Sequence, residues 1–143
     1  MSKFSRFMKS NKTERTNGFY APTKSLCDEN GKPLEWEFRH ITSREHGDMQ
    51  DACTIDVPVT GKPNVYRPRV QSGKYIRKLI AASVVMPDLL DAELQDSYGV
   101  NTPEELLLAM VDDPGEYNDL SAFVQRFQGF DVPFQEKVNE AKN

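Results

Sequence analysis

Residues 113–129 read DPGEYNDLSAFVQRFQG and contain the clearest helical pattern in this chain. Five apolar side chains recur there at the spacing of a single helix face: Tyr117, Leu120, Phe123, Val124 and Phe127. Asp113 and Pro114 are typical of a helix start, and Gly129 is typical of a helix end. The segment therefore predicts an amphipathic helix with one buried face.

The sequence around this helix is strongly acidic. From Leu79 to Gln125 the chain carries ten carboxylates and neither Lys nor Arg. The leucines and aromatic residues of this stretch fall at helical spacing, so the carboxylates are expected on the solvent side of an apolar layer. The sequence predicts one strongly negative face, which disfavours DNA as a partner.

Further helices are predicted upstream. A helical period begins at Ser72 and stops at Pro87. Its buried face is predicted to consist of Tyr75, Ile76, Leu79, Ile80 and Ser83. A short helix from about Asp91 should end at Gly99, and Thr102-Pro103-Glu104-Glu105 begins another helix with a cap, a proline and an acidic first turn.

Alternating patterns predict strands in the N-terminal half. Leu34, Trp36 and Phe38 alternate with charged residues, and the Asn30-Gly31 pair just upstream is typical of a tight turn. A hairpin is therefore expected between residues 24–27 and residues 34–41.

A helix and a second pair of strands are predicted next. Thr42 and Glu45 form a capping box, which predicts a helix running to about Cys53. Residues 55–59 and 66–70 alternate and read as two strands, which their prolines confine to sheet edges.

The predicted fold class is α+β, a small antiparallel sheet from the N-terminal half packed with about five helices that are mostly C-terminal. The last of these is expected at about residues 133–141. Residues 1–24 carry six Lys or Arg and one Glu, with too few apolar side chains to order the backbone, and predict a flexible basic arm. Residues 25–143 predict a single domain.

The cysteine content, the length of the apolar runs and the N-terminal stretch predict where the protein is located. Two cysteines are too few for a disulfide framework and read as free thiols. The longest apolar run, residues 79–86, is too short to cross a bilayer, and the basic N-terminal stretch lacks the apolar segment of a signal peptide. A soluble protein in the cytoplasm, without membrane contact, is expected.

Two thiols and two imidazoles, from Cys27, His40, His46 and Cys53, could supply a tetrahedral zinc site. Neither half of the set has the close spacing that pre-forms such a site, and the two histidines are predicted on different elements. Core or surface roles are favoured, so no metal or other cofactor is predicted.

The many carboxylates could instead perform acid-base chemistry or hold Mg²⁺. No basic residue lies nearby in the sequence to orient them, and Glu104, Glu105, Asp113 and Glu116 occupy positions that stabilise a helix start. Neither a nucleophile motif nor a phosphate loop accompanies them. The prediction is a protein that is not an enzyme, with no catalytic residue assigned.

A basic stretch offers a third possible site. Arg67, Arg69, Lys74, Arg77 and Lys78 are interleaved with Tyr66 and Tyr75, a pattern that also occurs on nucleic-acid-binding surfaces. The net charge of −4 and the adjacent negative face would repel phosphates. Pairing of these bases with the protein's own carboxylates, or with a protein partner, is favoured over nucleic acid.

Several phrases in the chain together resemble one known family. They are Val84-Val85-Met86-Pro87, Leu94-Gln95-Asp96-Ser97-Tyr98-Gly99-Val100, Pro103-Glu104-Glu105-Leu106-Leu107 and Gly115-Glu116-Tyr117, with Lys32-Pro33-Leu34-Glu35-Trp36-Glu37-Phe38-Arg39 upstream. With these phrases the chain resembles the XkdN-like family of phage tail assembly chaperones, found in contractile-tailed phages, prophages and phage-like particles of Gram-positive bacteria. The resemblance covers about residues 25–143 in order.

This resemblance implies a non-enzymatic factor in the cytoplasm of the bacterial host, absent from the finished virion. The implied partner is the tape measure protein, a long helical protein that the chaperone coats and keeps soluble until tail tube subunits replace it. The tail tube protein is a second candidate partner, and self-association is open because a basic arm and an acidic body share one chain. The alternative function is a structural tail or connector component of the virion.

Tail chaperones of this class are often made in two lengths by ribosomal slippage. Residues 141–143, Ala-Lys-Asn, can be encoded as GCA AAA AAC, which contains the slippery sequence A AAA AAC in the correct frame. Two interpretations stay open, a frayed polar terminus or a programmed frameshift site that makes this chain the shorter product.

No residue is assigned to partner binding. The apolar residues Leu94, Tyr98, Leu106, Tyr117 and Phe123 could contact a client, but core packing is the favoured prediction for most of them.

Overall fold

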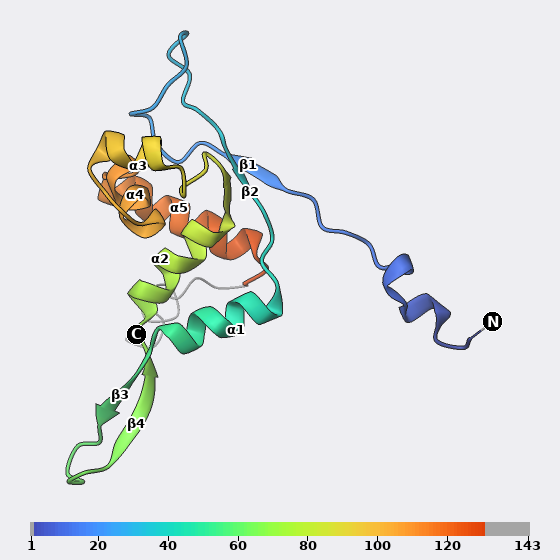
Figure 1. Ribbon diagram of the computed structural model, residues 1–143, viewed down its shortest axis with the longest axis vertical. Helices are drawn as coiled ribbons and strands as arrows, with labels where there is room; N and C mark the ends of the chain where they lie inside the picture. Colours follow the sequence, from blue (N-terminus) through green and yellow to red (C-terminus); the bar gives the residue numbers. More distant parts are fainter. Residues whose placement is uncertain (1, 131–143) are drawn as a thin grey trace, which may run out of the picture.

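A computed structural model describes residues 2–130 of the chain (Figure 1). Five α-helices cross or cover the body: α1 (Ser43–Ala52), α2 (Ser72–Ser83), α3 (Ala92–Tyr98), α4 (Pro103–Met110) and α5 (Pro114–Phe127). The strands are β1 (Gly18–Tyr20), β2 (Trp36–Phe38), β3 (Thr54–Pro58), β4 (Tyr66–Val70) and β5 (Val84–Met86). Two single-turn 3-10 helices, η1 (Ser5–Phe7) and η2 (Lys9–Asn11), precede them. The predicted α+β class is confirmed.

The α2 helix lies at the centre of the body, and its buried face is the one predicted. Tyr75, Ile76, Leu79, Ile80 and Ser83 are all buried. The helix contacts α1, α4 and α5, so the apolar side chains of these three helices meet on it. The side chains that complete the core around α2 include Trp36, Phe38, Leu106, Leu107, Leu120 and Val124.

The central sheet is antiparallel with strand order β1-β2-β5. The predicted hairpin is correct at its loop, where Cys27 bridges Pro33 and Leu34 N–H donates to Leu26 C=O. It is wrong about the main pairing, because β2 pairs with residues 18–20 and not with residues 24–27. The chain turns inward between the two pairings, where Pro22 and Thr23 are buried.

The third strand of this sheet corrects the prediction that the α2 helix runs to Pro87. The helix ends at Ser83, and Val84–Met86 form β5, which pairs with β2. Val84 and Val85 are β-branched and favour strand over helix when a partner edge is present. The Ser83 hydroxyl donates to the carbonyl of Leu79, four residues back, at the point where the helix stops.

Helix ends follow the predicted capping pattern. Thr42 and Glu45 form the predicted capping box, each side chain accepting the other residue's backbone N–H. Asp91 and Thr102 cap α3 and α4, and Gly99 ends α3 with a positive φ of 69°. In α4 the Glu105 side chain departs from the predicted box, because it accepts from the N–H of Asn101, not from that of Thr102.

The β3–β4 pair, residues 54–70, is confirmed as a separate two-stranded hairpin. It projects from the body beyond α1 and α2 (Figure 1). All five residues of β4 are exposed. Below, "the hairpin" refers to these residues.

The segment predicted as a basic arm divides into two parts. Residues 2–17, below "the arm", stand away from the body, and almost all of their side chains are exposed (Figure 1). Residues 18–24 instead join the body through β1 and through buried Pro22 and Thr23. The predicted helix at 133–141 and the possible frameshift site at 141–143 lie outside the described residues.

The Glu45 carboxylate gives a pH-dependent contribution to stability. Arg39 donates two hydrogen bonds to it, at 3.1 and 2.5 Å. These bonds, with the Thr42 N–H, lower the pKa of Glu45 from 4.5 to about 2. Between about pH 2 and pH 4.5 the unfolded chain binds a proton at Glu45 more readily than the folded protein does. The free energy of unfolding therefore rises with pH across this window.

We expect a Glu45→Gln variant to be less stable than the parent protein at pH 7, and the difference should disappear as the pH falls from about 4.5 to about 2. Urea unfolding at several pH values, followed by circular dichroism, measures this difference. Asp48→Asn, which removes an exposed carboxylate from the same helix, is the control. An equal stability difference between the variant and the parent protein at pH 7 and pH 2.5 would contradict the pH-dependent role given to the Glu45 carboxylate.

Candidate functional site

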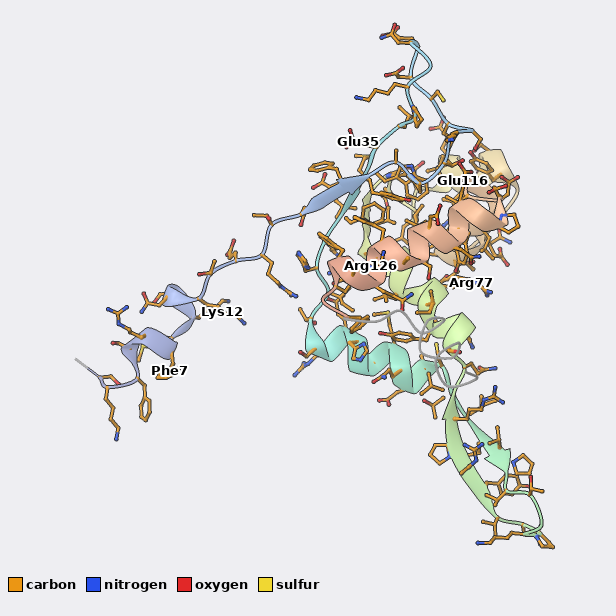
Figure 2. All side chains as sticks on the ribbon, turned by 180° about the vertical axis from the view of Figure 1, so that it is seen from behind. Phe7, Lys12, Glu35, Arg77, Glu116 and Arg126 are labelled. Atoms are coloured by element: carbon orange, nitrogen blue, oxygen red, sulfur yellow. The ribbon has the colours of Figure 1, made fainter. Side chains whose placement is uncertain are left out.

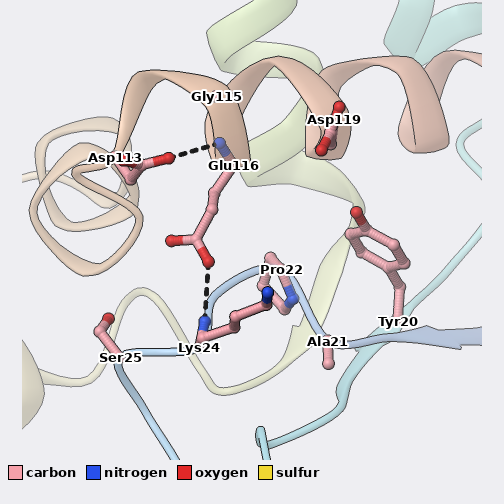
Figure 3. Close-up of a pocket in the computed structure, with 9 residues that line it drawn as sticks. All are labelled: Tyr20, Ala21, Pro22, Lys24, Ser25, Asp113, Gly115, Glu116 and Asp119. Carbon is pink, nitrogen blue, oxygen red and sulfur yellow. Dashed lines mark hydrogen bonds between the residues drawn. The ribbon is translucent and has the colours of Figure 1, made fainter.

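A groove runs along one side of α5, between this helix and residues 20–25. It consists of two adjoining cavities of about 770 and 560 Å³, which share Tyr20 and Asp119. Below it is called the α5 groove. Its first half lies beside the N-terminal turn of α5 (Figure 3), and its second half extends along the helix past Phe123 to Phe127.

Glu116 holds the two walls of the groove together. One carboxylate oxygen accepts a hydrogen bond from the Thr23 hydroxyl at 2.8 Å. The other accepts from the Lys24 N–H, also at 2.8 Å (Figure 3). Thr23 is only 2 % exposed and also bonds Ser25. Glu116 lies in the first turn of α5, as predicted, and its side chain additionally bonds across the groove. Asp113 caps α5 by accepting from the Glu116 N–H.

Aromatic rings form the floor of the groove. Tyr20 and Phe123 stack with ring centres 4.5 Å apart, and Phe123 and Phe127 stack at 5.7 Å. Phe127 stacks in turn on His40 at 4.0 Å. At position 18 a β-carbon would lie 2.7 Å from the Phe127 ring, so the close approach of β1 to α5 requires glycine.

The half of the groove beside the start of α5 has a mainly acidic rim. Asp113, Glu116 and Asp119 line it from α5, and Lys24 faces them from the opposite wall. Arg126 lines the second half, with Phe123 and Phe127. Burial raises the pKa of the Tyr20 hydroxyl, and the nearby Asp119 and Glu116 carboxylates raise this pKa further. An aromatic floor with carboxylates at its edge suits a partner segment that combines apolar and basic side chains.

The structure separates the four residues considered as zinc ligands. Cys27 is exposed and donates through its thiol to the Lys24 carbonyl, whereas Cys53 is buried in the core. His40 stacks on Phe127, and the Nδ1 of His46 bonds the Tyr75 hydroxyl. Among residues 2–130, no group of three or more His, Cys, Asp or Glu side chains has a metal-binding arrangement.

The predicted basic stretch is also divided. Arg67 and Arg69 lie on the exposed hairpin, opposite Val57 and Ile55 of β3. Tyr75 is buried and cannot stack on a base. Lys78 forms a 3.7 Å ion pair with Glu104, as favoured from the sequence.

The ten carboxylates of residues 79–125 lie where the sequence predicted. None is buried, and only Glu104 and Glu116 are half-buried. Among the apolar candidates for partner contact, Leu106 is fully buried, Leu94, Tyr117 and Phe123 are partly buried against the core, and Tyr98 is exposed. Core packing is therefore the main role of this set, although Phe123 also lines the α5 groove.

Comparisons with known proteins agree with this architecture. Residues 4–142 match the family described as phage XkdN-like tail assembly chaperone protein. The chain belongs to the XkdN-like family of phage tail assembly chaperones. A crystal structure of the protein yqbn superimposes with a TM-score of 0.73 at 18 % identity, covering 92 % of this chain and 99 % of the other, and so shows the same fold. A search of curated proteins gave no match.

The family resemblance in the sequence thus identified the chaperone family correctly, but sequence reasoning missed the groove of this chaperone. Tyr20, Pro22 and Thr23 were grouped with the arm because basic residues dominate upstream of them and Lys24 follows directly. Phe19-Tyr20-Ala21-Pro22 is a short apolar run inside that stretch and was the available signal.

None of the helices within residues 2–130 combines the length and apolar character required to span a membrane.

A Glu116→Ala variant should lose about 1.5–3 kcal/mol of unfolding free energy, because two hydrogen bonds to a carboxylate disappear and buried Thr23 loses its acceptor. Urea unfolding measures the loss, and amide hydrogen exchange should show reduced protection at Lys24. Asp119→Ala removes the same charge three residues further along α5 and is the control. Equal stability of the two variants would contradict the role given to Glu116.

Proposed function

We propose that this tail assembly chaperone binds the tape measure protein of a phage tail and keeps it soluble until tail tube subunits assemble around it. The observation that carries this proposal is the family match over residues 4–142. The proposed role requires no catalysis, is carried out in the cytoplasm of the bacterial host, and ends before the virion is complete.

Exposed apolar side chains outside the core support a binding role. On the hairpin, Ile55, Val65, Tyr66 and Val70 are between 38 and 60 % exposed. In the strand register Tyr66 and Val70 lie on one face of this two-stranded ribbon and Ile55 lies on the other, beside Arg69, so each face offers exposed apolar surface to a partner. These exposed side chains suit an apolar stripe on a helical client, and the acidic surface of the helical body would keep the complex in solution.

Co-expression with the tape measure protein tests the proposal. We expect the chaperone to co-purify with this client and to increase the soluble fraction of the client several-fold. A double variant, Ile55→Ser with Tyr66→Ser, should lose most of this effect without changing its own thermal unfolding, because both side chains are exposed.

Leu90→Ser is the matched control, since Leu90 is an exposed apolar residue outside the hairpin. If the unaltered chaperone neither co-purifies with the client nor raises its solubility, the proposed function is wrong. If Leu90→Ser is as harmful as the double variant, the hairpin is not the binding surface. Mass spectrometry of purified particles should not detect the chain, whereas a structural tail component would be present.

A further inference from the structure

The arm carries apolar side chains that no other part of residues 2–130 covers. Phe7 is 85 % exposed, and Phe4 and Met8 are more than half exposed. Figure 2 shows Phe7 and Lys12 on a segment well separated from the body. The Phe4 and Phe7 rings contact each other edge to face at 6.4 Å, and the Lys3 ammonium lies over Phe4 at 5.3 Å. The arm thus presents a small aromatic cluster to its surroundings.

Basic residues surround this cluster. Residues 2–17 contain five Lys or Arg and one Glu. The α5 groove combines the aromatic floor of Tyr20, Phe123 and Phe127 with three carboxylates, and two basic residues also line it. The carboxylates are those of Asp113, Glu116 and Asp119, and the basic residues are Lys24 and Arg126. Both the apolar and the charged groups of the arm therefore have counterparts in the groove.

We propose that the arm of one copy of this protein binds the α5 groove of a second copy. The proposal goes beyond the chaperone function and does not depend on the client. Aromatic side chains of the arm would pack against the floor of the groove, and its Lys and Arg side chains would approach the acidic rim.

The root of the arm favours a second copy over the arm's own groove. The Arg15 guanidinium donates to the Ile41 carbonyl at 2.9 Å, and the Asn17 amide donates to the Glu37 carboxylate at 2.8 Å. These bonds hold the root beside β2, and from there the arm leads away from the body (Figures 1 and 2). To reach its own groove the arm would have to turn back past these anchored residues, whereas the groove of a second copy can approach the arm as it lies.

Other surfaces fit the arm less well. The hairpin carries Arg67 and Arg69 and would repel it. A cavity of about 430 Å³ near α2 mixes Arg39 and Lys78 with Asp88 and Glu104, and no aromatic ring lines it. Because every copy has both an arm and a groove, reciprocal exchange can close a two-fold dimer.

Crosslinking between differently substituted copies tests the contact directly. Ser10→Cys, at an exposed position of the arm, and Ala122→Cys would be made in separate chains, both with Cys27→Ser, and mixed with a short bismaleimide. Ala122 lines the groove, and the remaining Cys53 is fully buried. We expect a crosslinked heterodimer in this mixture. A chain carrying both substitutions should likewise form crosslinks between copies.

Lys62→Cys at the exposed turn of the hairpin replaces Ala122→Cys in the control mixture. An equal yield with this control would overturn the proposal, because the contact would then be nonspecific. A doubly substituted chain that crosslinks only within itself would also overturn it, because the arm would then occupy its own groove.

Charge exchange provides an independent test by sedimentation equilibrium. Asp119→Lys or Arg6→Glu should each weaken self-association about 3- to 10-fold, and the double variant should recover part of the loss. Phe7→Ser should weaken it more, whereas Asp96→Lys, an exposed site on α3, should have little effect. A protein that stays monomeric, or whose association is unchanged by Phe7→Ser, would contradict the proposal.

Discussion

Burial of the α2 helix is the constraint on which the rest of the structure depends. Leu79 and Ile80 are fully buried, and the helix contacts α1, α4 and α5 at the same time. Each such side chain contributes about 1.5–3 kcal/mol through removal of apolar surface from water. The strand β5 follows directly after α2, so the same helix also positions the edge of the central sheet. Gln128, just beyond α5, bonds the Arg39 carbonyl, the Ile41 N–H and the Ser83 hydroxyl, and so joins the ends of α5, β2 and α2.

With the core formed in this way, the surface of the molecule divides by charge and by apolar character. The helical part from α3 to α5 is acidic, and its carboxylates lie in solvent or at helix starts. The arm and the hairpin, which both expose apolar side chains, carry more basic than acidic residues. In the contact between copies proposed above, the basic arm approaches this acidic surface, while the net charge of −4 opposes nonspecific aggregation.

The sequence predicted those parts of the fold in which local patterns agree with tertiary packing. The five buried residues of α2, the capping box of Thr42 and Glu45, and the Gly99 helix end are determined by spacing and backbone chemistry, which a single sequence reveals. The strand β5 was missed because its choice between helix and strand depends on the edge of β2, which is distant in sequence. The role of Glu116 was missed for the same reason, since its partners Thr23 and Lys24 lie about ninety residues upstream.

The candidate site was less predictable than the fold because segments distant in the sequence form it, and none of these segments has a pattern that by itself indicates a groove. Tyr20 lies in a basic stretch and Phe123 on a regular amphipathic helix, yet their stacking creates the floor of the α5 groove. The close approach that allows this stacking depends on Gly18, which leaves room for the Phe127 ring, and on Glu116, which holds residues 23 and 24 to α5. The root of the arm directly precedes β1, and its own bonds, from Arg15 to the Ile41 carbonyl and from Asn17 to the Glu37 carboxylate, set where the arm leaves the body. Different bonds therefore position the groove and the arm, and β1 is the segment that connects them.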